Sequence, residues 1–210
     1  MRSGQFLKIA LRVSLKPVRL NLGRRMSTTL SPFALQIAYR HSASPKRLSA
    51  PAPDEATLCA AAAAAYAAPS HAKPFPVRFV VIRDREKLAE LFTMDLPAEA
   101  TEEDRCKAAG KARKGPLQIA VILRHSSTES PREAMESAMT AGAALMNFLH
   151  VLTDAGFAAK TVSGRNFRNP KGLYDPTDET LAAFIICGTP TDPATSAALR
   201  EMPGDFLQTF

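Results

Sequence analysis

The spacing of apolar and polar residues predicts helices in the first part of the chain. The pair Ser31 and Pro32 is typical of a helix start, and the apolar residues after it predict a helix over 32–40. Prolines predict an extended loop over 42–53, because proline lacks the N–H group that a helix uses. Asp54 then predicts the start of a second, alanine-rich helix that ends at the next proline.

Strand patterns and a further helix follow. The β-branched and aromatic run 77–82 and the apolar run 117–123 predict two strands. Between them, acidic residues followed by basic residues predict a helix over about 101–114, an arrangement that suits the helix dipole. Two more strands are predicted near 158–163 and 182–187.

The most distinctive element is a helix predicted from Pro131 to Gly156. Ser130 and Glu133 have the spacing of a capping box at its start. Residues 138–152 are apolar nearly all round, and a helix without a polar face is buried on all sides. A single small domain can hardly bury such a helix, so the pattern predicts a long central helix that also lies at a subunit interface. The order of elements predicts an α+β sandwich.

The first 30 residues form a basic N-terminal extension, which we place outside the predicted domain of residues 31–210. Apolar and basic residues at helical spacing predict a basic amphipathic helix within the first 25 residues, and its charges exclude a membrane span. Two origins stay open. The extension is a mitochondrial presequence in a eukaryote, or it precedes a true start at Met26 in a bacterium, where the protein is expected in the cytoplasm.

The net charge of +7 comes from this extension rather than from the body of the protein. Residues 1–53 contain ten Lys and Arg and no Asp or Glu, whereas the rest of the chain carries about −3. A domain that binds nucleic acid through its folded surface carries its positive charge there, so we expect no nucleic-acid partner. The extension itself could still act as an arm toward a membrane surface or nucleic acid.

Local motifs of several common enzyme classes are absent from the sequence. Cys59, Cys106 and Cys187 lie far apart without a Cys-x-x-Cys pair, which favours a reducing compartment and argues against a clustered zinc site. The histidines lack zincin spacing, the glycines form neither a Rossmann fingerprint nor a P-loop, and no nucleophile elbow occurs. We expect no metal ion.

Several short motifs together resemble the small flavin-dependent nitroreductases, and the compact YdjA-like subgroup is the nearest. The resemblance covers residues 31–210 and depends on the order and spacing of the motifs. These are Arg40-His41-Ser42, Ala68-Pro69-Ser70-His71, Arg78-Phe79-Val80-Val81-Ile82, Lys111-Ala112-Arg113, Gly156-Phe157, Ser163-Gly164 and Gly188-Thr189-Pro190.

The resemblance implies a central, mainly antiparallel sheet flanked by helices, in a homodimer with two FMN molecules at the subunit interface. In such an enzyme NADH or NADPH passes a hydride to flavin N5, and a nitroaromatic or quinone-like acceptor then takes the electrons. No side chain is expected to be catalytic, because the flavin carries the chemistry. The alternative is a nitroreductase-fold dimer with a degenerate flavin site that acts as a binding or scaffolding protein.

The same resemblance implies which residues bind the flavin. A guanidinium donates two hydrogen bonds to a phosphate, so Arg40 is the expected phosphate ligand and Arg47 a second one. The other residues are expected to contact phosphate, ribityl or ring atoms. The full set is Arg40, His41, Ser42, Arg47, His71, Phe75, Thr161, Val162 and Ser163.

Purely structural interpretations of these residues stay open. Arg40 at a helix C-terminus would complement the helix dipole, and His71 would be an ordinary turn residue. Phe75 and Val77 stand where the subgroup has glutamine and tryptophan. Because a phenyl ring cannot hydrogen-bond the polar edge of a flavin, the sequence also permits an altered or lost cofactor site.

Overall fold

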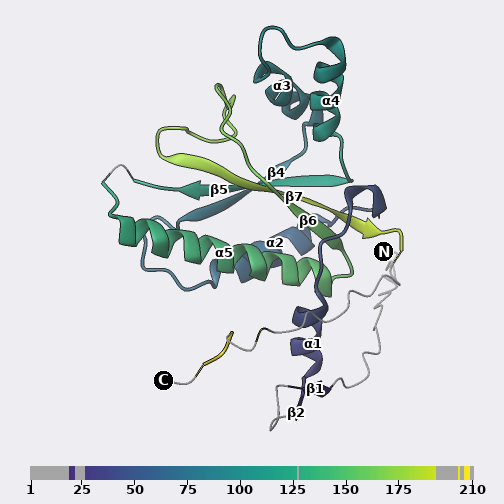
Figure 1. The fold of residues 1–210 in the computed structure, drawn as a ribbon, viewed down its shortest axis with the longest axis vertical. Coiled ribbons are helices and arrows are strands. Elements are labelled where there is room, and N and C mark those ends of the chain that lie inside the picture. Colours follow the sequence, from purple (N-terminus) through teal and green to yellow (C-terminus); the bar gives the residue numbers. More distant parts are fainter. Residues whose placement is uncertain (1–18, 22–26, 127, 193–202, 204–205, 209–210) are drawn as a thin grey trace, which may run out of the picture. The chain divides into compact units, whose positions relative to one another are not determined.

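The computed structural model describes residues 19–21, 27–126, 128–192, 203 and 206–208, in two units (Figure 1). The first unit is residues 1–41 with 193–210, and the second is residues 42–192. The predicted domain boundary before residue 31 stays a prediction.

The described residues of the first unit form a strand pair and one helix. Strands β1 (Arg19–Asn21) and β2 (Ser27–Thr29) pair antiparallel. Helix α1 (Pro32–Tyr39) confirms the predicted first helix, and the Ser31 hydroxyl accepts a hydrogen bond from the Ala34 amide. The predicted amphipathic helix falls mostly outside the described residues, and at 19–21 it is wrong because β1 occupies that stretch.

The second unit is built on an antiparallel sheet. Its strands are β3 (Leu48–Ser49), β4 (Val77–Ile82), β5 (Leu117–Arg124), β6 (Ala158–Ser163) and β7 (Glu179–Pro190). The order is β3-β7-β5-β4, and β6 also pairs with β7. This arrangement confirms the predicted α+β fold with its antiparallel sheet.

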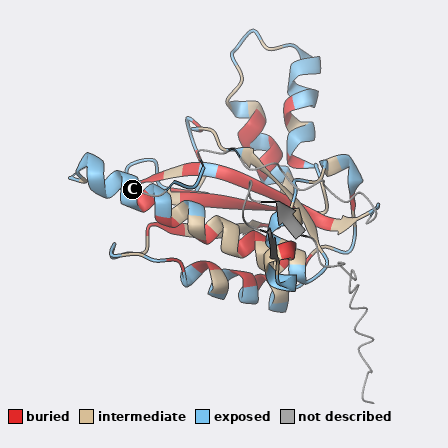
Figure 2. Cartoon of the chain, turned by 60° about the horizontal axis from the view of Figure 1, so that its bottom comes forward, coloured by how far each residue is buried: buried red, intermediate tan, exposed pale blue. Residues whose placement is uncertain are grey.

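Helices cover both faces of this sheet (Figure 1). On one side, α2 (Glu55–Tyr66) and α5 (Pro131–Asp154) pack on a core that includes Ile119 and Ile185. On the other side, α3 (Arg85–Met94) and α4 (Glu102–Ala112) form a hairpin over a second core. Figure 2 shows that buried residues concentrate in the strands and on the helix sides that face them.

Two predictions about connections were incomplete. The predicted extended loop over 42–53 contains a short 3-10 helix, Pro45–Arg47, as well as β3. The sequence pattern also predicts one helix between β4 and β5, whereas the structure has two. Asp84 caps the missed helix α3 by accepting a hydrogen bond from the Lys87 amide.

Helix α5 begins with the predicted capping box and buries one side within its own chain. Thr140, Ala144, Phe148 and Leu152 are buried at helical spacing. Met139 on another side is 68% exposed. The structure of one chain therefore does not show the burial on all sides that the sequence predicts for this helix.

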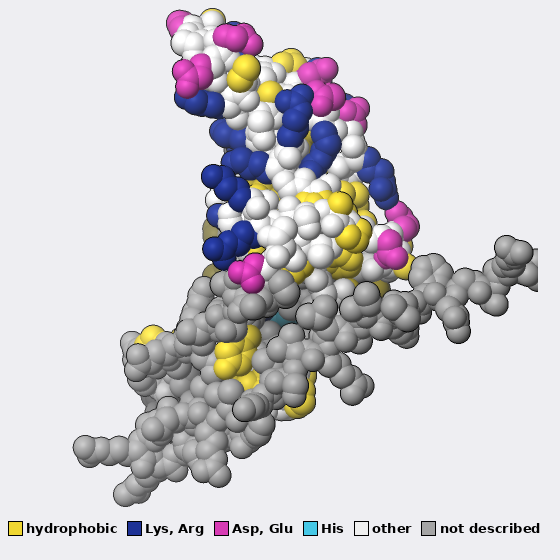
Figure 3. Space-filling view, turned by 90° about the vertical axis from the view of Figure 1, so that its right-hand side faces the viewer, with side chains coloured by type: hydrophobic (Ala, Val, Ile, Leu, Met, Phe, Trp, Pro, Cys, Tyr) yellow, Lys and Arg dark blue, Asp and Glu magenta, His cyan; other side chains and the backbone are white. Residues whose placement is uncertain are grey.

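Helix α4 carries acidic residues at its start and a basic residue at its end, as the sequence predicts. Its first turn holds three acidic residues and Lys111 lies in its last turn. On the face that Figure 3 shows, Asp and Glu gather at the far end of the α3 and α4 hairpin, and Lys and Arg lie nearer the sheet. Among the described residues, no helix is long and apolar enough to cross a membrane.

A buried amide on β5 holds the end of α4. Gln118 is 2% exposed, and its Nε2 donates to the carbonyls of Lys111 at 2.9 Å, Ala112 at 3.2 Å and Lys114 at 3.0 Å. Gln118→Met keeps the side-chain length but removes the donor, so we expect the free energy of unfolding to fall by about 1–3 kcal/mol. Urea denaturation measures this, with the exposed Gln208→Met as control. Equal urea midpoints for the wild-type protein, Gln118→Met and Gln208→Met would contradict this role of the Gln118 amide.

Candidate functional site

Strand β6 carries three of the predicted site residues, Thr161, Val162 and Ser163. Because side chains point to opposite faces in turn along a strand, Val162 lies on one face of the sheet and the other two lie on the opposite face. Ala159 packs on the core beneath α2 and α5, whereas Val162 packs on the core beneath α3 and α4. Because side chains alternate along a strand, Thr161 shares the face of Ala159, and Ser163 follows on that face with an exposed side chain. The Val162 side chain therefore has a packing role on the opposite face.

The glycine of the Ser163-Gly164 motif is required by the fold itself. A Cβ atom at Gly164 would lie 1.8 Å from the carbonyl oxygen of Leu181, far inside van der Waals contact. The Gly164 amide also donates to the Ala182 carbonyl at 3.0 Å. The close approach of these backbones accounts for this glycine without any ligand.

The segment that begins at Ser42 lies beside the start of β6. The Ala43 amide donates to the Ala159 carbonyl at 3.0 Å, and the Thr191 amide donates to the Arg47 carbonyl at 3.0 Å. A strand rises about 3.3 Å per residue, so Thr161 lies roughly 7 Å along β6 from this attachment. Ser42 and Arg47 are exposed. The structure thus brings Ser42 beside the start of β6.

Arg40 and His41 end the first unit, while the other seven predicted residues belong to the second. Arg40 caps α1, and its amide donates to the carbonyls of Gln36 at 3.1 Å and Ile37 at 3.2 Å. The exposed His41 places Nδ1 3.3 Å from the Tyr39 carbonyl. Arg40 thus caps α1 through its backbone amide, which any residue except proline could provide. Its guanidinium as a phosphate ligand or as a complement to the helix dipole stays a prediction.

Residues 67–76 connect α2 to β4 and carry His71 and Phe75. His71 is exposed. Phe75 is half-buried, packs against the core beneath α2 and α5, and has its ring centroid 4.9 Å from that of Tyr66. Phe75 is thus a packed residue that presents apolar surface at this place.

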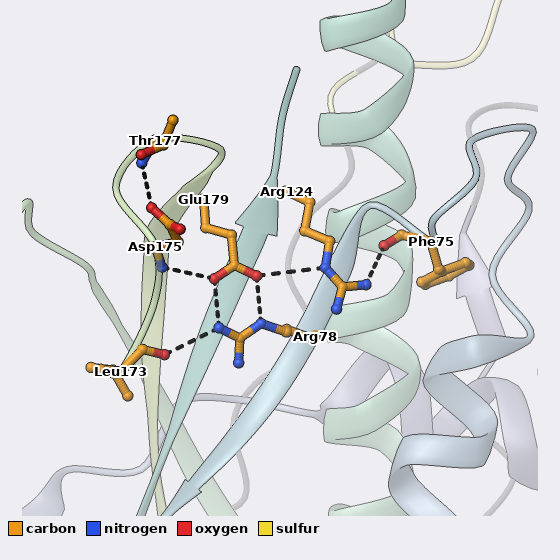
Figure 4. Close-up of polar contacts among 7 residues, drawn as sticks. All are labelled: Phe75, Arg78, Arg124, Leu173, Asp175, Thr177 and Glu179. Carbon is orange, nitrogen blue, oxygen red and sulfur yellow. Dashed lines mark hydrogen bonds and ion pairs between the residues drawn. The ribbon is translucent and has the colours of Figure 1, made fainter. Parts of the chain in front are cut away.

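An ion cluster that the sequence patterns do not predict lies across the ends of three strands (Figure 4). The nearly buried carboxylate of Glu179 on β7 accepts from Arg78 Nε at 2.6 Å and from Arg78 Nη2 at 2.5 Å, and lies 3.5 Å from Arg124 Nε. These hydrogen bonds outweigh burial and lower the pKa of Glu179 to about 2. The same carboxylate raises the pKa of Arg78.

A signal for this cluster exists in the sequence. Arg78 interrupts the apolar run of β4, and Arg124 ends the apolar run of β5. Two partly buried arginines in adjacent strands favour a carboxylate between them, because a nearby opposite charge offsets the cost of burying theirs. Nothing local in the sequence indicates that Glu179, about a hundred residues after Arg78, is that partner.

The comparisons with known proteins decide the family. The sequence profile of the Nitroreductase family matches residues 37–189, which include the capped end of α1, the segment 67–76 and all of β6. This chain belongs to the nitroreductase family. The assignment makes it an oxidoreductase, and the YdjA-like subgroup stays a prediction.

Relatives of this nitroreductase-family chain agree with the assignment. A candidate NAD(P)H nitroreductase of Haemophilus influenzae is 29% identical over 158 residues, which cover 71% of this chain and 84% of that protein. The structure of a nitroreductase-like family protein from Bacillus cereus matches with a TM-score of 0.70 at 20% identity, over 87% of this chain and 98% of that one.

A candidate nitroreductase from Desulfovibrio desulfuricans, solved in complex with FMN, has the same fold. It matches with a TM-score of 0.63 at 22% identity, over 87% of this chain and 98% of that one. At this identity the likeness establishes the fold of the nitroreductase-family chain.

Proposed function

We propose that this chain transfers electrons from NADH or NADPH, through bound FMN, to an electron-poor acceptor such as a nitroaromatic or a quinone. The observation that carries the proposal is the family match over residues 37–189, which contain every predicted flavin-binding residue. The names of two relatives support it, since one is called an NAD(P)H nitroreductase and the other is an FMN complex.

The residues present fit the chemistry of FMN. The exposed hydroxyls of Ser42 and Ser163 and the guanidinium of Arg47 can donate to ribityl or phosphate oxygens, and Arg40 can donate two hydrogen bonds to a phosphate. Phe75, packed on Tyr66, offers apolar surface to a flat ring system. Bound FMN supplies the electron-transfer chemistry, so the protein's task is to bind, orient and shield it.

A homodimer is part of the proposal. Met135 and Met139 on α5 are 58% and 68% exposed, one helical turn apart, and Tyr66 at the end of α2 is 71% exposed. Large apolar side chains gathered on a surface mark interaction sites. A second copy of the chain is the partner that would complete the burial of α5.

The visible spectrum of the purified full-length protein tests the function. We expect flavin absorbance, release of FMN on denaturation, and oxidation of NADH or NADPH that requires both FMN and a quinone or nitroaromatic acceptor. The rate with each nicotinamide shows which donor is used. A colourless protein that gains no flavin absorbance on addition of FMN would overturn the proposal and favour a scaffolding or binding role.

Two substitutions test which residues hold the flavin. A charged hydrogen bond to phosphate contributes about 1.5–3 kcal/mol, so Arg40→Ala is expected to weaken FMN binding by about tenfold or more. Phe75→Gln adds at most one neutral hydrogen bond, about 0.5–1.5 kcal/mol, and removes the ring packed on Tyr66. The loss at Arg40 should therefore exceed any gain at Phe75, as measured by flavin fluorescence titration at constant salt.

The control is Arg83→Ala, which removes an exposed arginine paired with the exposed Glu55. It should bind FMN as the parent protein does. Unchanged affinity in Arg40→Ala would show that the motif at 40–42 is not a phosphate site.

A further inference from the structure

Three of the ten residues in the segment 67–76 lack a backbone donor. Prolines occupy positions 69, 74 and 76, and proline has no N–H group to donate. Such a segment is best fixed through its carbonyl oxygens, by donors from neighbouring elements. At its start, the Thr140 hydroxyl of α5 donates to the Pro69 carbonyl at 2.7 Å.

Arg124 of β5 holds the other end of the segment with two groups. Its backbone amide donates to the Pro76 carbonyl at 2.8 Å, which continues the pairing of β5 with β4. Its side chain reaches one residue further, and Nη1 donates to the Phe75 carbonyl at 3.1 Å (Figure 4). The guanidinium thus adds a hydrogen bond beyond the strand pairing, to the segment that carries His71.

The direction of this guanidinium is set by Glu179. Arg124 Nε faces Glu179 Oε1 at 3.5 Å while Nη1 faces Phe75. Glu179 is itself fixed, because Arg78 binds both of its oxygens and the Asp175 amide donates to Oε2 at 3.0 Å. The ion pair with this fixed carboxylate orients the planar guanidinium, so that Nη1 on its other edge meets the Phe75 carbonyl.

We infer that Arg124 is a positioning residue for cofactor binding, which fixes the backbone at Phe75 and with it the segment 67–76, under the control of Glu179. This inference rests on the proposed function, since it assigns the segment to the flavin site. It also explains why arginine stands at the end of β5, because lysine has one charged nitrogen and cannot face Glu179 and the Phe75 carbonyl along two directions at once.

The first test measures the segment itself, without FMN. A nitroxide label is placed at the exposed Ala72 through Ala72→Cys in full-length protein that carries Cys59→Ser and Cys106→Ser. Cys187 is fully buried, and burial raises the pKa of its thiol to about 12, so it will not react. We expect Arg124→Met to shorten the correlation time of the label at least about twofold.

Two comparisons make this result specific. Arg83→Met removes an exposed arginine of an exposed ion pair and should leave the label unchanged. Arg124→Lys keeps the charge opposite Glu179 and should give an intermediate mobility, which also serves if Arg124→Met does not fold. Label mobility equal to the parent in both Arg124 variants would overturn the inference.

The second test measures FMN affinity by fluorescence titration on the unlabelled variants. We expect Arg124→Met to bind FMN about tenfold more weakly, Arg124→Lys to lie between, and Arg83→Met to match the parent. A more mobile segment with unchanged FMN affinity would overturn the positioning role. If the parent itself binds no FMN, the proposed function fails, while the label still decides whether Arg124 fixes the segment.

Discussion

Ala144→Asp is expected to unfold the second unit of the protein. Ala144 is 0% exposed and lies with Phe148 and Leu152 in the core beneath α2 and α5. An unpaired carboxylate in this core costs several kcal/mol, and a domain of this size is stable by only about 5–15 kcal/mol. Circular dichroism and urea denaturation should show a protein that lacks a cooperative transition or has lost most of its stability.

Met139→Asp is the matched control on the same helix. Met139 is 68% exposed within one chain, so its replacement by aspartate should leave the fold intact. If the proposed dimer buries this side of α5, the same change should dissociate it, which sedimentation velocity measures. A wild-type protein that sediments as a monomer at micromolar concentration would contradict the dimer, and a stable, cooperatively folded Ala144→Asp would contradict the core assignment.

Glu179→Gln is expected to cost about 3 kcal/mol of unfolding free energy at pH 7. The pKa of Glu179 falls from an ordinary value of 4.5 to about 2, because Arg78 is hydrogen-bonded to the carboxylate. Each pKa unit corresponds to about 1.4 kcal/mol. Since the folded-state pKa is the lower one, this stabilisation is complete above about pH 4.5 and is lost as the pH falls toward 2.

Urea unfolding at pH 7 and at pH 3 separates this effect from a general loss of packing. The wild-type protein should lose more stability between the two pH values than Glu179→Gln, which has no carboxylate to protonate. Glu55→Gln removes an exposed carboxylate, 75% accessible and paired with the exposed Arg83, and should cost less than about 1 kcal/mol. An equal pH dependence in wild type and Glu179→Gln would contradict the role of this ion cluster.

The sequence by itself determined the elements whose signals are local. The β-branched run predicted β4 at its observed bounds of Val77–Ile82. The capping residues Asp54 and Ser130 predicted the starts of α2 and α5, because a cap bonds to an amide three residues away. The order of motifs also predicted the family, since a family profile is itself a pattern along the chain.

Only the tertiary structure decided the features that depend on residues far apart in the chain. The Arg78 and Glu179 pair joins positions 101 residues apart, and Gly164 is required because Leu181 of β7 approaches it. The packing of Phe75 on Tyr66 and the hold of Arg124 on the Phe75 carbonyl likewise follow from the folding of α2, β4 and β5 together. Spacing along a sequence reports the period of a helix or strand, whereas these contacts depend on which strands pair and in which register.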